Sequence, residues 1–407
     1  MVNWNDKLAG RTTFMRRSAI REILKLTQRP DIISFAGGLP APELFPVERI
    51  EAATQEIWRR RSSESLQYNT TEGLTELRDW IAARLSRGGV NITRDNILIV
   101  SGSQQAIDLV GRVLLDDGDH LVLESPTYVG MLTAWRSYQP RFSVIPTDAD
   151  GLIVDEYLET VLRQKPKLAY LMPNFQNPQG TTLSYERRVE LVKLLAEYDV
   201  AVMEDNPYGE LRYSGDALPA LYELEAQQRG STKLDGLVVY AGTFSKILTP
   251  GLRVGWVAAP EEVIEKLVQA KQGADLQTST LSQILTYEVC KDGFIDGHIE
   301  QLRAVYRERR DVMLAAMERY FPEEARWSRP EGGLFLMVTV PEHIDSGELL
   351  KDAIEHKVAF VPGTDFYITG GQNTFRLNYS NAQPDMIEEG IHRLGTLLKE
   401  VTVRQVV

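Results

Sequence analysis

A lysine beside a hydroxyl and near a lone arginine is the part of this sequence best suited to chemistry. Ser245 and Lys246 end the stretch 241–246, which follows directly on the apolar run 237–240, and Arg253 lies a few positions on, between two glycines. Hydroxyl and guanidinium groups bind phosphate, so this layout suits an amine held beside a bound phosphate. Such an amine indicates a Schiff base with pyridoxal phosphate. The alternative is that Lys246 is an ordinary surface lysine at the end of a strand.

Two further segments follow short apolar runs. Small residues in the turn 101–105 (Ser-Gly-Ser-Gln-Gln) let backbone N–H groups and the positive end of a following helix face an anion. A plain connection between strand and helix is the alternative. Tyr128 ends the stretch 124–128, where its ring suits stacking on a flat cofactor or, alternatively, packing at the edge of the core.

Two stretches offer groups that suit the polar atoms of a pyridine ring. Asn177 lies in Asn-Pro-Gln-Gly, a tight turn that aims its amide and suits a phenolate oxygen. Asp205 follows another apolar run, and a carboxylate there keeps a pyridine nitrogen protonated, which makes the ring an electron sink. Tyr208 stands three residues on and suits the same phenolate oxygen. A mere turn and a carboxylate that caps a strand end remain the alternatives.

The bulk composition excludes some classes of function. The chain has 407 residues, 43% apolar and 25% charged, as in ordinary globular proteins. Its net charge of −12 argues against nucleic acid as the main partner. The single cysteine, Cys290, fits a reducing compartment and the packing of a helix. The polar N-terminus has no signal-like apolar stretch, and no segment predicts a membrane span, so we expect a cytoplasmic protein without a metal site.

Short apolar runs alternate with amphipathic helical patterns along most of the chain. This order predicts a mostly parallel sheet covered by helices on both faces, with ligands beyond the carboxyl ends of its strands. The expected strands are 32–35, 97–100, 120–123, 168–172, 200–203, 237–240, 254–258, 334–340, 359–361 and 374–379. The expected helices are Ser18 to just before Pro30, 46–61, 75–86, 104–115, 185–198, a long helical stretch over 261–321, 346–356 and a last one from 385.

The patterns also predict a division into domains. An N-terminal arm and helix over 1–45 would join the C-terminal residues 296–407 in a smaller α+β domain. Residues 46–295 would form the large domain that binds the cofactor.

Taken together, these motifs resemble the pyridoxal-phosphate-dependent aminotransferases of fold type I, class I/II. The resemblance covers nearly the whole chain and is most specific in Asn177-Pro178-x-Gly180, Asp205-x-x-Tyr208 and Ser245-Lys246 followed by Arg253. Within this group the chain is most similar to bacterial 2-aminoadipate aminotransferases of the lysine-biosynthesis type. That closer similarity rests on the stretches 20–24, 34–40, 66–68 with Gly73, 102–105 and 271–276. It implies an α/β fold of type I, with a helix-covered, mostly parallel sheet and a smaller α+β domain.

The resemblance also implies roles for individual residues of the cofactor site. Lys246 would carry the cofactor and act as general base and acid, with Asp205 and Tyr208 as the other catalytic residues. The residues implied to bind the cofactor are Ser103, Gln104, Tyr128, Asn177, Asp205, Tyr208, Ser245, Lys246, Arg253 and Tyr68 of a neighbouring subunit. The last of these implies a homodimer with shared active sites. Gln179 departs from the threonine commoner in the turn.

The substrate residues are implied to be Arg376, Gly38, Asn177 and Arg21. Arg376 would grip the substrate α-carboxylate, because its forked guanidinium binds carboxylates through two hydrogen bonds. Arg21, on a mobile N-terminal helix, would pair with the distal carboxylate of 2-aminoadipate, glutamate or 2-oxoglutarate and withdraw for apolar or aromatic substrates. The alternative is a solvated helix arginine paired with Glu22 or Asp31.

The expected function is transfer of an amino group between an L-amino acid and 2-oxoglutarate, with 2-aminoadipate or a broad range of acidic, branched-chain and aromatic substrates. One alternative is a lyase or decarboxylase that uses the same cofactor. Another is a transcription regulator that keeps this fold as an effector sensor. Such regulators carry a winged-helix domain ahead of the fold, and here the pattern of the fold begins by about residue 18.

Overall fold

The computed structural model describes residues 3–15 and 31–403. Its largest element is an eight-stranded sheet with the strand order β2-β9-β8-β7-β6-β3-β4-β5. The strands are β2 (Ile97–Val100), β3 (His120–Ser125), β4 (Arg141–Asp148), β5 (Gly151–Leu152), β6 (Leu168–Leu171), β7 (Ala201–Asp205), β8 (Val238–Thr243) and β9 (Gly255–Ala258). Strands β2 and β6 are wholly buried, as expected for strands that are covered on both faces.

The strand directions bring several loops to one edge of this sheet. Strands β8, β7, β6, β3 and β4 are parallel, whereas β9 is antiparallel to both β2 and β8, and β5 is antiparallel to β4. Strand β2 therefore points the same way as β8. The carboxyl ends of β2, β3, β6, β7 and β8 lie along one edge, together with the start of β9. This confirms the expected mostly parallel sheet.

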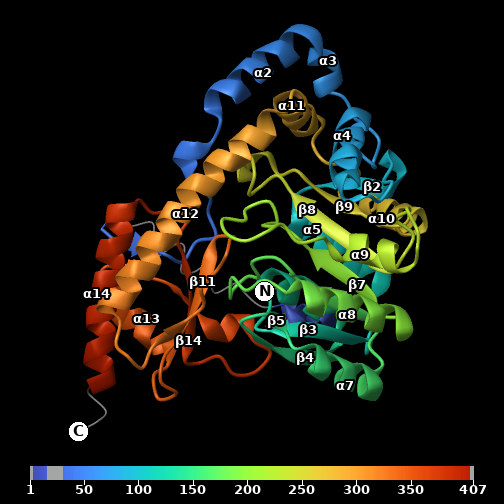
Figure 1. Cartoon of the computed structure of the whole chain (residues 1–407). Helices are drawn as coiled ribbons and strands as arrows, with labels where there is room; N and C mark the ends of the chain where they lie inside the picture. Colours follow the sequence, from blue (N-terminus) through green and yellow to red (C-terminus); the bar gives the residue numbers. More distant parts are fainter. Residues whose placement is uncertain (1–2, 16–30, 404–407) are drawn as a thin grey trace.

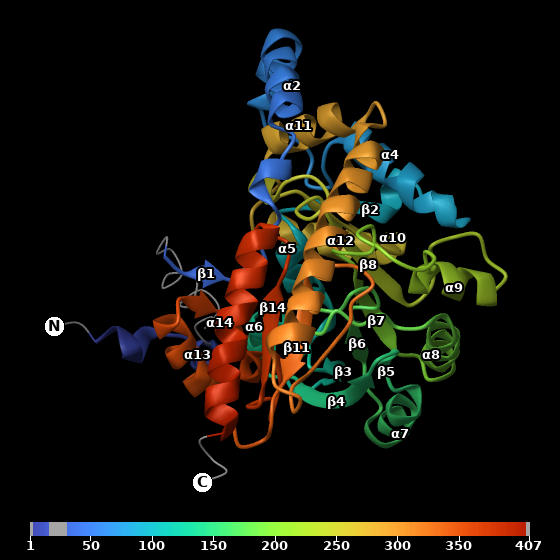
Figure 2. The same ribbon diagram turned by 60° about the vertical axis from the view of Figure 1, so that its left-hand side comes forward.

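Helices cover both faces of the sheet. In Figures 1 and 2, α7, α8 and α9 lie on one side of it, and α5 and α6 on the other. The helices are α2 (Val47–Arg60), α3 (Ser62–Ser65), α4 (Thr75–Leu85), α5 (Ser103–Leu114), α6 (Val129–Trp135), α7 (Val154–Gln164), α8 (Tyr185–Glu197), α9 (Leu221–Gln228), α10 (Glu261–Gln272), α11 (Thr280–Cys290), α12 (Phe294–Tyr320), α13 (Ser346–Glu355) and α14 (Pro384–Val403). Short 3₁₀ helices cover Trp4–Lys7, Gly10–Phe14, Pro42–Leu44, Ser86–Gly88, Arg94–Asn96, Arg136–Tyr138, Pro250–Leu252 and Gly363–Phe366.

A smaller layer packs beside the large sheet. It contains a four-stranded antiparallel sheet with the order β10-β11-β14-β13 and a two-stranded parallel pair, β1 with β12. These strands are β1 (Ile33–Ser34), β10 (Arg326–Trp327), β11 (Phe335–Thr339), β12 (Val358–Ala359), β13 (Val361–Pro362) and β14 (Thr374–Asn378). Helices α12 and α14 lie side by side along this layer (Figure 1).

Three expectations need correction. The helical stretch 261–321 is divided into α10, α11 and α12, with breaks at 273–279 and 291–293. Gly293, with φ of +76°, favours the second break, because other residues rarely adopt that conformation. The expected strand 359–361 is two short strands that pair with different partners, β12 with β1 and β13 with β14. Strand β4 was missed, because its polar residues obscure the strand pattern.

The expected helix between Ser18 and Pro30 lies outside the described residues. Cys290 is free and buried at the end of α11, in agreement with a packing role. No helix in the described part of the chain combines the length and apolar character needed to cross a bilayer.

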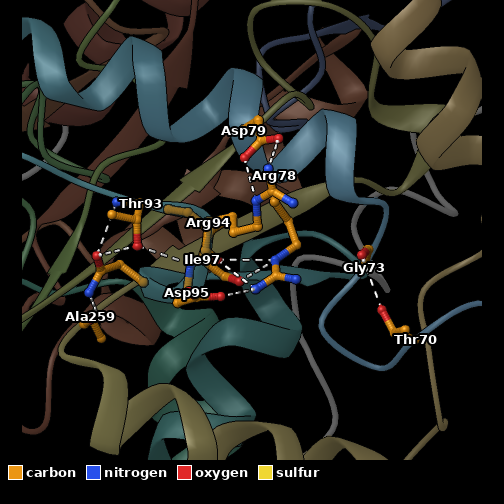
Figure 3. A network of polar contacts seen from close by, with 10 residues as sticks. Thr70, Gly73, Arg78, Asp79, Thr93, Arg94, Asp95, Ile97 and Ala259 are labelled. Atoms are coloured by element: carbon orange, nitrogen blue, oxygen red, sulfur yellow. Dashed lines mark hydrogen bonds and ion pairs between the residues drawn. The ribbon is translucent and has the colours of Figure 1, made fainter.

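A polar network fixes strand β2, which leads into the turn at Gly102 (Figure 3). The buried Arg78 on α4 donates to the carbonyl of Arg94 through Nε at 3.1 Å and Nη2 at 2.6 Å. Its Nε also donates to the carbonyl of Ile97 at 3.0 Å. Asn96 donates to the carbonyl of Ala259, at the end of β9, at 3.1 Å. The network therefore joins α4 to the start of β2 and, through Asn96, to the end of β9.

Replacing Arg78 by methionine should destabilise the protein, because it leaves the carbonyls of Arg94 and Ile97 without this donor. A buried acceptor that loses its partner costs roughly 1–3 kcal/mol, so we expect a loss of about that size in the free energy of unfolding. Urea unfolding measures it by linear extrapolation. The exposed Arg87 is the matched control, and Arg87→Met should change stability by less than about 0.5 kcal/mol. Equal stability of the two variants would contradict the role of the network.

Candidate active site

The residues predicted to do chemistry lie at the carboxyl edge of the large sheet. Asp205 is the last residue of β7, and Lys246 follows three residues after the end of β8. Gly255, the first residue of β9, pairs with Val100 on one side and Thr243 on the other. This register brings the segment around Arg253 beside the ends of both β2 and β8.

The Lys246 amine lies in a partly buried position between the two layers. Its Nζ donates to the carbonyl of Gly38 at 2.7 Å, across 208 positions of sequence. Burial, together with the positive charges of Arg376 and Arg253, lowers the pKa of Lys246 to about 8. Roughly a tenth of the amine is therefore neutral at pH 7, against less than about a thousandth at the ordinary lysine pKa, and the neutral form is the one that a nucleophile or a proton acceptor requires. The alternative of a surface lysine does not fit this environment.

Asp205 is 1% exposed and carries one carboxylate oxygen that has a partner and one that has none. The hydroxyl of Tyr170, on β6, donates to its Oδ2 at 2.5 Å. Its Oδ1 is buried without a hydrogen-bond partner among the described residues. Burial raises the pKa of Asp205 to about 7, and the hydrogen bond from Tyr170 opposes that rise. A cationic donor beside Oδ1 would stabilise the charged carboxylate.

Arg376 is a buried cation on β14. Its Nη1 donates to Oδ1 of Asn177 at 2.9 Å and its Nη2 to the carbonyl of Ala36 at 2.7 Å. The guanidinium carbon lies 4.1 Å from the centre of the Phe335 ring and 5.0 Å from that of Phe366. Burial lowers the pKa of Arg376 to about 10, so it remains charged at neutral pH. No carboxylate pairs with Arg376 in the described part of the chain, which suits it to an anionic substrate group.

The turn between β2 and α5 forms a cradle with Arg253. Gly102 has φ of +81°, and a Cβ on it would lie 2.5 Å from Nη2 of Arg253, so only glycine fits there. Arg253 donates through Nη2 to the carbonyl of Ser101 at 3.1 Å and through Nη1 to the hydroxyl of Ser245 at 3.4 Å. Ser103 is the first residue of α5. Helix N–H groups, two hydroxyls and a guanidinium together suit a phosphate.

A buried lysine is joined to this cradle by hydrogen bonds through Gln105. Lys271 is fully buried and donates to Oε1 of Gln105 and to both oxygens of Asp275, at 2.8 to 2.9 Å. The same Gln105 oxygen accepts from the backbone N–H of Ser101 at 2.8 Å. No role was predicted for these residues. The spacing of four between Lys271 and Asp275 is a signal for an ion pair, but not for its place behind the cradle.

Two of the predicted tyrosines, Tyr128 and Tyr208, lie near these groups. The Tyr128 hydroxyl lies 3.5 Å from Oε1 of Gln104, and burial raises its pKa to about 12. Tyr208 is buried edge-on against Phe335, at 5.8 Å between ring centres. Burial raises its pKa, and a hydrogen bond with Asn177 opposes the shift. Tyr68, in contrast, is 77% exposed.

One predicted feature lies apart from the others. The Gln179 side chain accepts from the hydroxyl of Thr147 at 2.7 Å, a contact within the large domain rather than with any of the site residues. Arg21 lies outside the described residues. No role was predicted for Tyr170, Phe335 or the carbonyl of Ala36, because nothing in their local sequence distinguishes them from core or loop residues. Gly38 was predicted to lie near the substrate, but the contact of its carbonyl with Lys246 was not.

Three features at this edge of the sheet match the parts of pyridoxal phosphate. The Lys246 amine matches the aldehyde, the Oδ1 of Asp205, unpartnered within the described ranges, matches the ring nitrogen, and the cradle at Gly102 matches the phosphate. The residues present therefore fit this cofactor. Among the described residues, no group of three or more His, Cys, Asp or Glu side chains is placed to hold a metal ion. The fold and the site define a pyridoxal-phosphate-dependent enzyme of fold type I.

Comparison with known proteins identifies the family to which this enzyme belongs. The family model of class I and II aminotransferases matches residues 30–394, and the chain belongs to this family. It is 43% identical to 2-aminoadipate transaminase of Thermus thermophilus, over 98% of each chain. It is also 43% identical to aromatic-amino-acid aminotransferase 1 of Thermococcus litoralis, over 95% of this chain and 92% of that protein. The crystal structure of LysN, the α-aminoadipate aminotransferase of Thermus thermophilus, in complex with N-(5′-phosphopyridoxyl)-L-leucine, matches with a TM-score of 0.92 at 41% identity, over 99% of this chain and 100% of that one. The protein is a pyridoxal-phosphate-dependent aminotransferase.

Proposed function

We propose that this aminotransferase moves amino groups between 2-oxoglutarate and 2-aminoadipate, and that it also accepts branched-chain and aromatic amino acids. The observation that carries the proposal is the buried Arg376, which faces no carboxylate of the described chain and is charged at neutral pH. It suits the α-carboxylate shared by all these substrates. The range of side chains is supported by the two relatives of equal identity, one named for 2-aminoadipate and one for aromatic amino acids.

Each residue of the site would have a distinct task. Bound pyridoxal phosphate supplies an aldehyde that takes up the amino group and a ring that withdraws electrons from the substrate Cα. Lys246 would take the proton from the substrate Cα on its neutral Nζ. It would then deliver that proton to the cofactor carbon that carries the transferred nitrogen. Asp205 would hold a proton on the ring nitrogen through its free Oδ1. Asn177 and Tyr208 would bind the ring hydroxyl oxygen.

The other residues would anchor the cofactor and line the substrate site. Ser103, Gln104, Ser245 and Arg253 would hold the phosphate, and Tyr128 would stack on the ring. These contacts are the same before and during the reaction, so they anchor the cofactor rather than lower the barrier. Gly38 would line the substrate site, where its carbonyl already accepts from Lys246.

A panel of amino donors with 2-oxoglutarate tests the substrate proposal. It should contain 2-aminoadipate, leucine, kynurenine and aromatic amino acids, with glutamate formation as the readout. We expect turnover with 2-aminoadipate and with at least one apolar or aromatic donor. Turnover of aspartate alone would contradict it. Conversion of the cofactor to its amino form by the donor alone, reversed by 2-oxoglutarate, separates an aminotransferase from a lyase or decarboxylase.

Arg21→Ala should impair acidic substrates selectively, if Arg21 pairs with their distal carboxylate. Loss of a charge-assisted hydrogen bond costs roughly 1.5–3 kcal/mol, so we expect about a 10- to 100-fold loss in kcat/KM for 2-aminoadipate. The value for leucine should change less than about threefold. Steady-state kinetics with both donors measures the difference. An equal loss for both would leave Arg21 as a helix arginine without contact to substrate.

Cofactor capture by the apoenzyme should depend on pH through Lys246. Its amine is charged below the pKa of about 8 and neutral above it, and only the neutral amine attacks an aldehyde. The capture rate should therefore rise with pH between roughly pH 6 and 9 and level off above. Stopped-flow absorbance after addition of pyridoxal phosphate measures this. A midpoint near the ordinary lysine value of about 10.4 would contradict the depressed pKa.

We further propose a cytoplasmic homodimer in which Tyr68 reaches the phosphate of the neighbouring subunit. Its 77% exposure in the single chain supports a contact outside its own chain. We also propose that the chain is divided into a small domain, formed by residues 1–45 with 296–407, and a large domain, formed by residues 46–295. The pairing of β1 with β12 supports it, although the boundary at 295 falls within the first turn of α12. Sedimentation and limited proteolysis test these two points.

A further inference from the structure

The buried pair of Lys271 and Asp275 lies next to the turn at Gly102 and has no task in the reaction proposed above. Lys271 belongs to the last turn of α10, which packs against α5 and β2. Its side chain is fully buried, whereas lysines are almost never fully buried unless they are paired. All three of its N–H groups are used, one by Gln105 and two by the oxygens of Asp275.

A buried ion pair of this kind is weak evidence for stability. Taking both charges out of water costs about as much as their attraction returns, so apolar residues of similar size are often at least as stable. Lys271 and Asp275 also cancel each other's charge, so the pair adds no net positive charge to the cradle. It does fix the Gln105 side chain, which also donates through Nε2 to Asp275 at 2.8 Å. The effect of the pair on its surroundings is therefore one of geometry.

Gln105 carries that fixed position to the cradle. Its Oε1 accepts from Lys271 and from the backbone N–H of Ser101, both at 2.8 Å. The carbonyl of Ser101 accepts in turn from Nη2 of Arg253 at 3.1 Å. Ser101 is thus held through both polar groups of its backbone. A continuous chain of hydrogen bonds leads from Lys271 to the guanidinium of the cradle.

The turn depends on such outside contacts, because its own residues fix it weakly. Gly102 has φ of +81° and ψ of 165°, a conformation that is open essentially only to glycine. Glycine has no side chain to pack and loses more conformational freedom on ordering than any other residue. Holding Ser101 therefore keeps the start of α5 and Arg253 at the spacing that a phosphate bound by both requires.

We propose that Lys271, together with Asp275, is a positioning residue for the phosphate of the cofactor. It orders Gln105, which fixes Ser101 and through it Arg253, so that the cradle is formed before the phosphate arrives. A preformed cradle binds more tightly, because less freedom is lost on binding. With all three N–H groups used, Lys271 has no donor left for the phosphate itself. The inference rests on the proposed role of the cradle, but not on which amino donor the enzyme uses.

The affinities of the apoenzyme for pyridoxal phosphate and for pyridoxal, which lacks only the phosphate, test this role. Lys271→Met keeps an unbranched side chain but removes its donors. We expect its Kd for pyridoxal phosphate to rise about tenfold and its Kd for pyridoxal to change less than about twofold. Fluorescence titration of the apoenzyme measures both. Lys266→Met, at an exposed position of the same helix, is the matched control and should bind both molecules as the wild type does.

A second variant tests the route through Gln105. Gln105→Met leaves the ion pair in place but breaks its link to Ser101, so it should also weaken binding of pyridoxal phosphate alone, by about tenfold. Since both variants break the same chain of contacts, the double variant should lose no more affinity than either variant by itself. Gln105→Met also decides the question if Lys271→Met does not fold.

Three results would overturn the role of Lys271. They are an equal loss of affinity for pyridoxal phosphate and pyridoxal, an unchanged Kd for pyridoxal phosphate, and additive losses in the double variant. Arg253→Met tests the cradle itself and should show a selective loss for pyridoxal phosphate. A selective loss there without one in Lys271→Met and Gln105→Met would refute the positioning role alone. No selective loss in Arg253→Met would refute the phosphate cradle, and the role of Lys271 with it.

Discussion

Lys246→Ala is expected to abolish turnover and the visible absorbance of the covalently held cofactor. No other described lysine donates to the carbonyl of Gly38 at the sheet edge, and none has its pKa lowered by Arg376 and Arg253. Both the covalent link and the movement of the Cα proton depend on this one amine. Losing a general base costs about 10²–10⁴-fold in rate, and losing the covalent link adds to that. Absorbance spectra and the transaminase assay measure the two effects.

The control for this variant is an exposed lysine on α10. Lys266→Ala should keep both the absorbance and the rate, since its side chain is exposed and, among the described residues, donates only to Gln269. Added methylamine should restore part of the activity of Lys246→Ala, because a small amine can enter the space left by the side chain. Measurable turnover of Lys246→Ala without added amine, at more than about 1% of the wild-type rate, would refute the catalytic role.

Asp205→Asn should reduce kcat by about a hundredfold or more, while the fold is preserved. The amide has nearly the shape of the carboxylate, so Tyr170 can still donate to its oxygen. It cannot stabilise a positive charge on the ring nitrogen through the position of Oδ1, and the ring then withdraws electrons less well. The measurement is kcat with 2-aminoadipate, together with a melting temperature to exclude unfolding. An effect on KM alone would contradict this assignment.

Tyr170→Phe provides the matched test of how Asp205 is tuned. The Tyr170 hydroxyl donates to the carboxylate and lowers its pKa against the effect of burial. Without that hydroxyl the pKa of Asp205 rises, so the carboxylate stays protonated to higher pH. The acidic limb of the pH–rate profile should therefore move to higher pH, with a smaller loss at the optimum than in Asp205→Asn. An unmoved acidic limb would assign Tyr170 a purely structural role.

The sequence predicts best those parts of the site that lie close along the chain. A fully buried strand reads as a continuous apolar run, so the ends of β2, β6, β7 and β8 could be placed from residue types alone. Because parallel strands end at one edge, residues just after those runs had to converge. Lys246 and Asp205 follow from this pattern. Strand β4, next to the short edge strand β5, is only partly buried and lacks the signal.

The contacts that tune those residues were decided by the tertiary structure. Lys246 meets the carbonyl of Gly38 and Arg376 meets that of Ala36, across 208 and 340 positions of sequence. Tyr170 meets Asp205 because their strands are neighbours, although β6 and β7 are separated by a helix. The sequence by itself therefore determined which groups are present and at which edge they gather, since strand and helix patterns are local. Their pKa values arise only when distant segments pack and exclude water, because burial and charge depend on all neighbours in space.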